Sequence, residues 1–381
     1  MMLESNFFKK KMCSITHAII LISAFSISSM IMNRWVLSEI GLYTLGRVWQ
    51  LFVSWEDYGF FRRGLIGTLL STIELRQIFS NDYHYALFTY HFIILSILSI
   101  IFCYTRIHKI NNATFLFTVF LSPALLFQLS YVSTSLDSFV FLFVLVNMLF
   151  VRNVSIFCLV IIAGILTHEL FFFTVPAQML AWHLRTSDAV HAPPRAGLWW
   201  PAVTALAAML IVSVYGKMDI AQGVFERDMV EKMRDAANWH PMWSGYFELN
   251  TSAEQNLMIA IEILKKEIKE NYTYLAIPLA YVFILALRVR SFMPGSFRFI
   301  LILTVSILPL SVSLIAYDYY RWIGFTCNLL ILFTLIICAR QNARATRFDW
   351  WLVPFSILGP LGNMPLNRPF PMLQSVFERL L

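Results

Sequence analysis

The amino-acid sequence predicts an all-α, polytopic integral membrane protein with about 10 or 11 transmembrane helices. The first observation behind this is composition: 59% of the 381 residues are hydrophobic, 13% are charged, and 34 are Phe. A soluble domain could not bury that much apolar surface. The second observation is that the apolar residues form long uninterrupted runs. Short alternating segments would be expected of a membrane β-barrel, so the runs indicate helices, which satisfy their backbone groups within one segment.

A run of about 20 apolar residues is long enough to cross a bilayer as a helix. We therefore expect spans near 14–35, 84–105, 113–131, 136–151, 153–167, 169–184, 198–216, 272–288, 299–316 and 323–339. The range 64–80 is short and contains Glu74 and Arg76, which predicts an interfacial or re-entrant helix. The range 350–366 is a candidate for an eleventh, short span. The whole chain, 1–381, is expected to be one membrane domain.

The distribution of Lys and Arg predicts the orientation, because short basic loops favour the cytoplasm. With a cytoplasmic N-terminus, the short basic loops all fall on the cytoplasmic side. Among them are the loops that contain Arg106, Arg152, Arg290, Arg298 and Arg340. The long segments 36–83 and 217–271 then become extracytoplasmic loops. The net charge of +7 reflects this bias, so no nucleic-acid partner is expected.

Ionisable residues on the predicted outer side are the candidates for function, because such residues at span ends are costly unless they are used. The segment WEDYGFFRRGLIG carries Asp57, Arg62 and Arg63. The planar guanidinium group binds phosphate oxygens in pairs, and glycine lets the backbone approach a ligand closely. The alternative is that the two arginines contact lipid headgroups or pair with Glu56 and Asp57.

A second candidate is the THE sequence, in which His168 and Glu169 separate two apolar runs. The pair could act as a general base with its orienting partner, or help to hold a divalent cation. The dipeptide lacks the second histidine of a helical zinc site, so no zinc site is predicted. Apart from a possible divalent cation at this pair, no cofactor is expected. The alternative for this pair is a hydrogen-bonded helix end.

Asp137 follows the segment SYVSTS at the start of a predicted span. Here helix N-capping by Ser133, Thr134, Ser135 or Asp137 is the slightly favoured interpretation, because all four are good capping residues.

The YDYYRW sequence contains Asp318 and Arg321, which could pair across one helical turn within an aromatic belt. That explanation suffices for this motif alone. The four motifs, however, all fall on the same side of the membrane, whereas accidental features would be scattered over both. We therefore expect one extracytoplasmic pocket, with aromatic rings for sugars, arginines for a diphosphate, and carboxylates and a histidine for proton abstraction. Without a Gly-rich nucleotide loop in the chain, a lipid-linked donor is expected.

These residues carry a resemblance to known families. An acidic residue in the first outer loop, followed by a re-entrant helix and many spans, resembles the multipass GT-C glycosyltransferases. The combination of FRRGLIG, HE followed by apolar residues and Pro, and DYYRW is similar to EpsG-like and Wzy-like polymerases of bacterial polysaccharide loci. The resemblance implies a GT-C-like fold in a bacterial inner membrane and an undecaprenyl-diphosphate-linked saccharide as partner. It also implies that Asp57 takes the loop-carboxylate position, although the first loop has no clear DxD.

The sequence-based hypothesis is a glycosyltransferase or polysaccharide polymerase with Asp57, His168 and Glu169 as catalytic residues. The expected substrate-binding residues are Arg62, Arg63, Asp137, Asp318 and Arg321. Two alternatives stay open. A flippase or transporter of lipid-linked saccharides would need the arginines without a base, but the sequence lacks the paired inverted halves expected of one. A non-catalytic membrane assembly protein would need none of these charged residues. The sequence does not indicate an oligomeric state.

Overall fold

The computed structural model describes residues 2–31, 49–130, 135–186, 199–218, 220–232, 272–293, 297–314, 319–341, 346–362 and 370–371, with a few isolated positions at 197 and between 258 and 269. Within these ranges all regular structure is helical, which confirms the predicted all-α class. The helices of the first half are α1 (Met2–Ile31), α3 (Trp55–Tyr58), α4 (Leu65–Thr72), α5 (Asp82–Ile107), α6 (Ala113–Phe120), α7 (Pro123–Leu129), α8 (Asp137–Leu149), α9 (Val154–Thr167) and α10 (Leu170–Thr186). Those of the second half are α11 (Trp199–Tyr215), α12 (Gln222–Lys232), α15 (Ala276–Phe292), α16 (Phe297–Ile307), α17 (Tyr319–Gln341) and α18 (Arg347–Ile357). Short 3-10 helices lie at Trp49–Leu51 (η2), Leu75–Ile78 (η3), Tyr272–Leu275 (η6) and Leu308–Leu314 (η7).

Three helical segments are long and apolar enough to cross a membrane: His84–Ile107, Thr273–Phe292 and Tyr319–Gln341. Shorter apolar helices accompany them at Ile15–Ile31, Asp137–Leu149, Val154–Thr167, Trp199–Tyr215 and Phe297–Ser313. The described chain is thus an all-helical protein with membrane-crossing segments, while the predicted number of spans stays a prediction.

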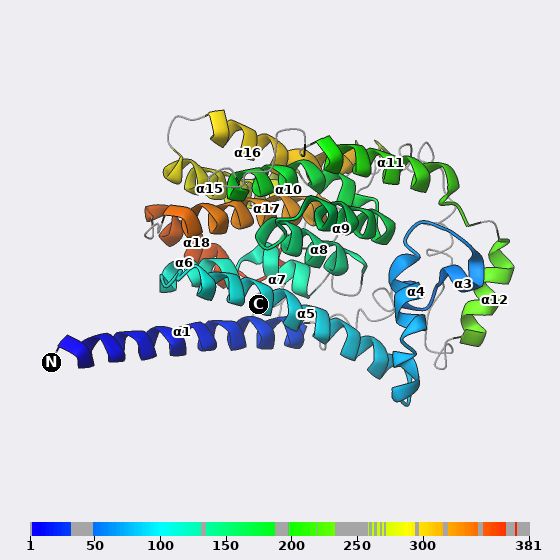
Figure 1. Ribbon diagram of the computed structural model, residues 1–381, viewed down its shortest axis with the longest axis horizontal. Helices are drawn as coiled ribbons and strands as arrows, with labels where there is room; N and C mark the ends of the chain where they lie inside the picture. The colour runs from blue at the N-terminus through cyan, green and yellow to red at the C-terminus, as the bar shows by residue number, and fades with distance from the viewer. Residues whose placement is uncertain are drawn as a thin grey trace.

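Helix α17 forms the centre of the bundle (Figure 1). Its 23 residues extend about 34 Å at about 1.5 Å per residue, comparable with a hydrocarbon core of about 30 Å. Nearly all of its length is buried, and it packs against α7, α8, α10, α15 and α16. Apolar composition alone does not place it there, because His84–Ile107 has the same mean hydropathy of 2.2 and is much less buried.

The range 113–131, predicted as one span, is instead two short helices, α6 and α7, so that prediction is wrong in this respect. The break falls at Ser122, whose hydroxyl accepts the backbone N–H of Leu125 at 3.3 Å and lies 2.8 Å from the hydroxyl of Tyr281. Pro123 begins α7, where its missing N–H costs nothing. The apolar run alone predicted one span, whereas Ser122 and Pro123 separate it into two helices.

Two other irregular ranges behave closer to expectation. The range 64–80 contains only α4 and η3, both too short to span a bilayer, which agrees with a short interfacial or re-entrant helix. The range 350–366 overlaps α18, whose 11 residues are also too few. The capping box of Thr346 and Asp349 starts α18, and Asp349 also pairs with the fully buried Arg288 of α15.

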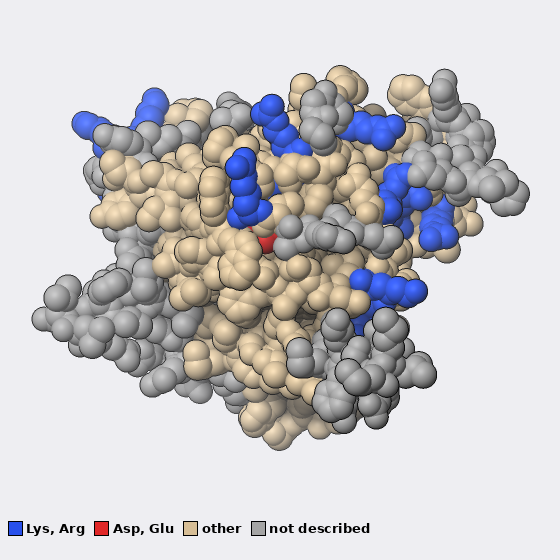
Figure 2. Space-filling view, turned by 90° about the vertical axis from the view of Figure 1, so that its left-hand side faces the viewer, with Lys and Arg blue, Asp and Glu red and all other residues tan. Residues whose placement is uncertain are grey.

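The two ends of the bundle differ in charge. The end where α5, α10, α15 and α17 terminate carries several separate Lys and Arg side chains, with little acidic surface visible among the described residues (Figure 2). Described basic residues at this end include Arg106, Lys109, Arg152, Arg185, Arg290, Arg298, Arg340 and Arg347. The opposite end, where α8, α10 and α17 begin, carries the candidate site.

Candidate functional site

Six ionisable side chains from four segments meet at one end of the bundle, and we call them the ionic cluster. They are Arg62, Arg63, Asp137, His168, Glu169 and Arg321. The arginine pair follows α3, Asp137 is the first residue of α8, and the His–Glu pair forms the turn from α9 to α10. Arg321 lies in the first turn of α17. Four of the predicted motifs therefore contribute to one cluster despite their separation in sequence.

Glu169 is the acceptor at one side of the cluster. Its Oε2 accepts a hydrogen bond from Nε of Arg63 at 2.9 Å, and its Oε1 lies 3.5 Å from Nε of Arg62. The same Oε2 lies 3.1 Å from Nδ1 of His168. Arg63 and His168 thus donate to a carboxylate whose side chain is 17% exposed, and Arg62 adds a second guanidinium charge within ion-pair distance.

Asp137 is the acceptor at the other side and is completely buried. Arg321 donates Nε–H and Nη2–H to its two carboxylate oxygens, a paired geometry that only a guanidinium group can provide. The slightly favoured interpretation of this residue as a helix N-cap is therefore wrong for its side chain. The N-cap position of α8 is Leu136, without a side-chain cap bond, although the hydroxyl of Ser135 accepts the backbone N–H of Asp137 at 3.3 Å. Ser133 and Thr134 lie outside the described residues.

His168 links the two carboxylates. Its Nε2 lies 3.1 Å from Nη2 of Arg321 and 3.8 Å from Oδ1 of Asp137. Because arginine can only donate, this contact favours an unprotonated Nε2 with the proton on Nδ1, where Glu169 accepts it. With this tautomer the ring accepts from Arg321 and donates to Glu169. The backbone N–H of Leu170, which lies 3.1 Å from Nδ1, would instead require the proton on Nε2.

Burial and charge determine the ionisation of the His–Glu turn, which lies outside the helical spans. Burial and the positive charge of Arg63 lower the pKa of His168, against the opposing effect of Glu169 and Asp137. For Glu169, burial acts to raise the pKa, but Arg63, His168 and Arg62 together hold it well below its usual range. The turn therefore carries a neutral imidazole beside an ionised carboxylate.

The arginine loop is folded against its own chain. Arg63 has φ of +66°, a left-handed conformation that costs a non-glycine residue free energy and occurs mostly where the surroundings impose it. A Cβ on Gly64 would lie 2.2 Å from Nε1 of Trp55, and one on Gly67 would lie 2.0 Å from the carbonyl oxygen of Val53. Gly64 and Gly67 therefore let the loop pack on itself, while the predicted role of glycine in approaching a ligand stays a prediction.

Two further glycines hold the cluster together, and the sequence analysis missed both. The carbonyl of Gly216, just after α11, accepts the backbone N–H of Arg62 at 2.9 Å. A Cβ on Gly164 of α9 would lie 2.3 Å from the ring of Phe171 in α10. Only a residue without a side chain lets the two helices meet closely enough to form the His168–Glu169 turn.

Asp57 does not join these contacts. Its carboxylate lies 2.5 Å from Nζ of Lys232 at the end of α12 and accepts a 2.5 Å hydrogen bond from the hydroxyl of Ser54. Burial acts to raise its pKa, but Lys232 and Ser54 outweigh it and lower the pKa. Asp57 is thus an ionised carboxylate on the same loop as the arginines, paired with a lysine that the sequence analysis did not identify. Asp318 lies outside the described residues.

A buried amide is a further polar group that sequence reasoning missed. Gln128 of α7 is completely buried, and neither atom of its side-chain amide has a partner among the described residues. Its backbone carbonyl accepts the hydroxyl of Ser138, the residue after Asp137. In the sequence, the position of Gln128 within the apolar run 113–131 could have indicated this buried polar group.

The cluster combines anion-binding and acid–base chemistry. Three guanidinium groups against two carboxylates leave one excess positive charge beside a neutral imidazole. Among the described residues, no group of three or more His, Cys, Asp or Glu side chains is arranged to hold a metal ion. No family model, curated protein or solved structure matches this chain.

Proposed function

We propose that this protein is a membrane glycosyltransferase or polysaccharide polymerase that uses a polyprenyl-diphosphate-linked sugar as donor. The observation that carries the proposal is the ionic cluster, in which Arg62, Arg63 and Arg321 surround the oriented pair His168 and Glu169. All six side chains are largely buried, yet five of them retain 8–19% exposure, so the cluster is partly accessible.

The arginines are the donor-binding groups in this proposal. Guanidinium groups bind phosphate oxygens in pairs, and the excess positive charge of the cluster favours an anionic ligand. Each arginine already contacts a carboxylate, so a diphosphate would exchange one oxyanion partner for another. Because Asp137 is completely buried, Nε of Arg321 stays on that carboxylate in this proposal while Nη2 turns to the diphosphate.

His168 is the proposed general base, oriented by Glu169 through Nδ1–H. Nε2 now accepts from Arg321, and when that arginine turns to the diphosphate, Nε2 becomes available to an acceptor hydroxyl. The hydroxyl proton then passes to Nε2, the hydroxyl oxygen bonds to the anomeric carbon, and the bond from that carbon to the diphosphate breaks. The polyprenyl diphosphate leaves with its electron pair stabilised by the arginines. Of the two bases expected from sequence, the contacts favour His168, because Asp57 is paired with Lys232.

The proposed reaction takes place at the outer face of a bacterial inner membrane, with the N-terminus in the cytoplasm. Support comes from the basic end of the bundle, which lies opposite the ionic cluster and by the positive-inside rule faces the cytoplasm. The predicted outer loop 217–271 includes α12, whose Lys232 contacts Asp57 beside the cluster.

The decisive experiment follows sugar transfer by the purified protein in lipid nanodiscs, with undecaprenyl-diphosphate-linked saccharide as donor. Replacement of the general base, His168→Gln, should lower turnover by about a hundredfold or more and leave binding of undecaprenyl diphosphate largely intact. Arg321→Lys should weaken that binding, because an ammonium group cannot reproduce the paired geometry. Arg152→Lys is the matched control, since Arg152 is exposed at the opposite end.

Three outcomes would reject the proposal. Movement of the lipid-linked saccharide between leaflets without a new glycosidic bond would favour the flippase. Unchanged activity in both cluster variants would separate the cluster from the reaction. Wild-type protein that neither binds undecaprenyl diphosphate nor moves the saccharide would favour an assembly role.

A further inference from the structure

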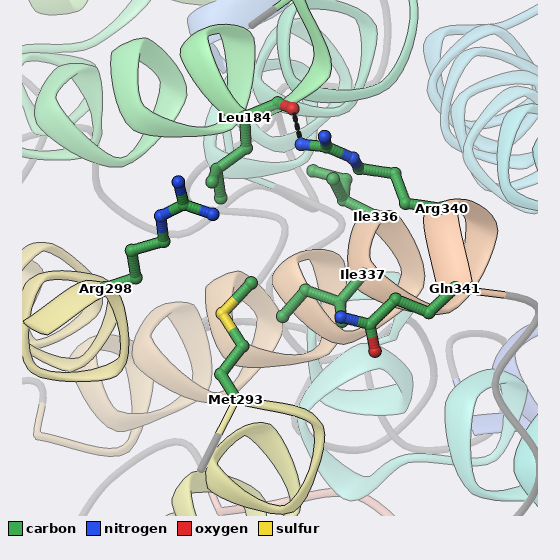
Figure 3. Close-up of a pocket in the computed structure, with 7 residues that line it drawn as sticks. All are labelled: Leu184, Met293, Arg298, Ile336, Ile337, Arg340 and Gln341. Atoms are coloured by element: carbon green, nitrogen blue, oxygen red, sulfur yellow. Dashed lines mark hydrogen bonds between the residues drawn. The ribbon is translucent and has the colours of Figure 1, made fainter. Parts of the chain in front are cut away.

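A cavity of about 220 Å³ lies at the basic end of the bundle, at the opposite ends of α10 and α17 from the ionic cluster (Figure 3). Its walls are apolar side chains from three helix ends: Leu184, Met293, Ile336 and Ile337. Along α17, the 19 residues from Arg321 to Arg340 correspond to about 28 Å, so this cavity is remote from the candidate site.

Two arginines bring positive charge to this cavity. Arg298 enters from the first turn of α16, and Arg340 enters from the last turn of α17 (Figure 3). Arg340 donates Nη1–H to the carbonyl of Leu184, which fixes its guanidinium group at the cavity wall. None of the seven lining residues is acidic. Among the described residues, no hydrogen-bond or ion-pair partner is shown for the side chain of Arg298.

We propose that this cavity binds the phosphate of one anionic phospholipid headgroup. Guanidinium groups are the preferred protein partners of phosphate, and the side chains of Arg298 and Arg340 both line this cavity, whose seven described lining residues include no carboxylate. Basic pockets between helices on the cytoplasmic side are a recognised type of lipid-headgroup site. The volume is below the roughly 300–1,000 Å³ of ordinary small-molecule sites, which suits a headgroup rather than a nucleotide sugar.

The neighbouring surface favours a lipid over a free anion. On α16, Phe297 is 76% exposed and Ile300 is 59% exposed, immediately beside Arg298. Contiguous exposed apolar side chains at the end of a membrane helix contact hydrocarbon. Acyl chains could lie along this face while the phosphate reaches the two arginines.

The bland explanation for both arginines is the positive-inside bias, which places basic residues on this end without any site. Arg290 provides the comparison. It is exposed in the last turn of α15, at the same end, but does not line the cavity. A bound headgroup requires Arg298 but not Arg290. Charge bias alone predicts the same contribution to lipid binding from Arg298 and Arg290.

The test measures lipid binding to the purified full-length protein in neutral detergent by native mass spectrometry. Dioleoylphosphatidylglycerol should be retained as one bound molecule more tightly than dioleoylphosphatidylcholine. Arg298→Ala should weaken phosphatidylglycerol binding about fivefold or more, as expected for one arginine on an anionic headgroup. Arg290→Ala should leave it unchanged. Because Arg298 is exposed at a helix start, its replacement should not prevent folding, and Arg298→Lys should restore part of the affinity.

Two results would overturn the proposal. Equal weakening by Arg298→Ala and Arg290→Ala would mean general attraction to a basic surface. Displacement of phosphatidylglycerol by millimolar inorganic phosphate, with the same dependence on Arg298, would mean that the cavity takes free phosphate and that the acyl chains add nothing. Sugar transfer is not a readout here, so failure of this site and failure of the proposed reaction are distinguishable.

Discussion

Replacing Asp137 by Asn tests whether the ionic cluster is an integral part of the fold. The substitution keeps the shape of the side chain but removes its charge, so Arg321 loses the carboxylate to which it donates two hydrogen bonds. Breaking a buried ion pair by removing one partner typically costs about 3–5 kcal/mol. Arg321 retains 12% exposure and its contact with His168, so we expect about 3 kcal/mol, the lower end of that range.

A double-mutant cycle isolates the pair from its surroundings. The free energy of unfolding is measured by denaturant titration in mixed micelles for the wild type, Asp137→Asn, Arg321→Gln and the double variant. Each single variant breaks the same ion pair and leaves the other partner without it. The double variant should therefore be more stable than the sum of the two single effects predicts, by about 1–3 kcal/mol. Arg152→Lys, exposed at the opposite end, should stay within about 0.5 kcal/mol of the wild type.

Either of two measurements would refute this reasoning. A change below about 0.5 kcal/mol for Asp137→Asn would show that the pair contributes no more than an exposed one. Strict additivity in the double variant would show that the two side chains do not depend on each other.

Three further predictions concern other parts of the molecule. The lowered pKa of His168 means that the unfolded chain binds more protons below about pH 6.5, so thermal stability should fall as pH drops through that value, and His168→Gln should flatten this fall in a pH series. Gly164→Ala would place a Cβ 2.3 Å from an aromatic ring of α10 and should lower the free energy of unfolding by about 1–3 kcal/mol. Gly223→Ala in α12 meets open space and should be neutral or stabilising, so equal effects of the two substitutions would contradict the packing argument. In a cysteine-free background, Lys217→Cys should react with an impermeant thiol reagent on intact cells and Arg290→Cys should not, and the reverse pattern would invert the predicted orientation.

The sequence was sufficient for the all-α class and for bringing most of the predicted site residues, though not Asp57, to one cluster. Composition and run length predict helices directly, because lipid tolerates only backbones that satisfy their own hydrogen bonds. Counting span ends brought Arg62, His168 and Arg321 to one side, and the structure confirms that they meet. That count remained useful although one predicted span is broken at Ser122, since α6 and α7 together occupy the place of one segment.

Only the tertiary structure decided which of these residues are partners. Hydropathy and spacing describe one segment at a time, whereas the Asp137–Arg321 pair joins positions 184 residues apart. Asp57 was expected among the catalytic residues, but the arrival of α12 beside its loop gives it Lys232 instead. The turn that presents His168 and Glu169 depends on the fit of Gly164 against Phe171, a contact set by the crossing of α9 and α10. Long apolar runs determine that helices form. How the helices pack depends on side-chain volume and on the pairing of buried charges, and both depend on which helices are neighbours.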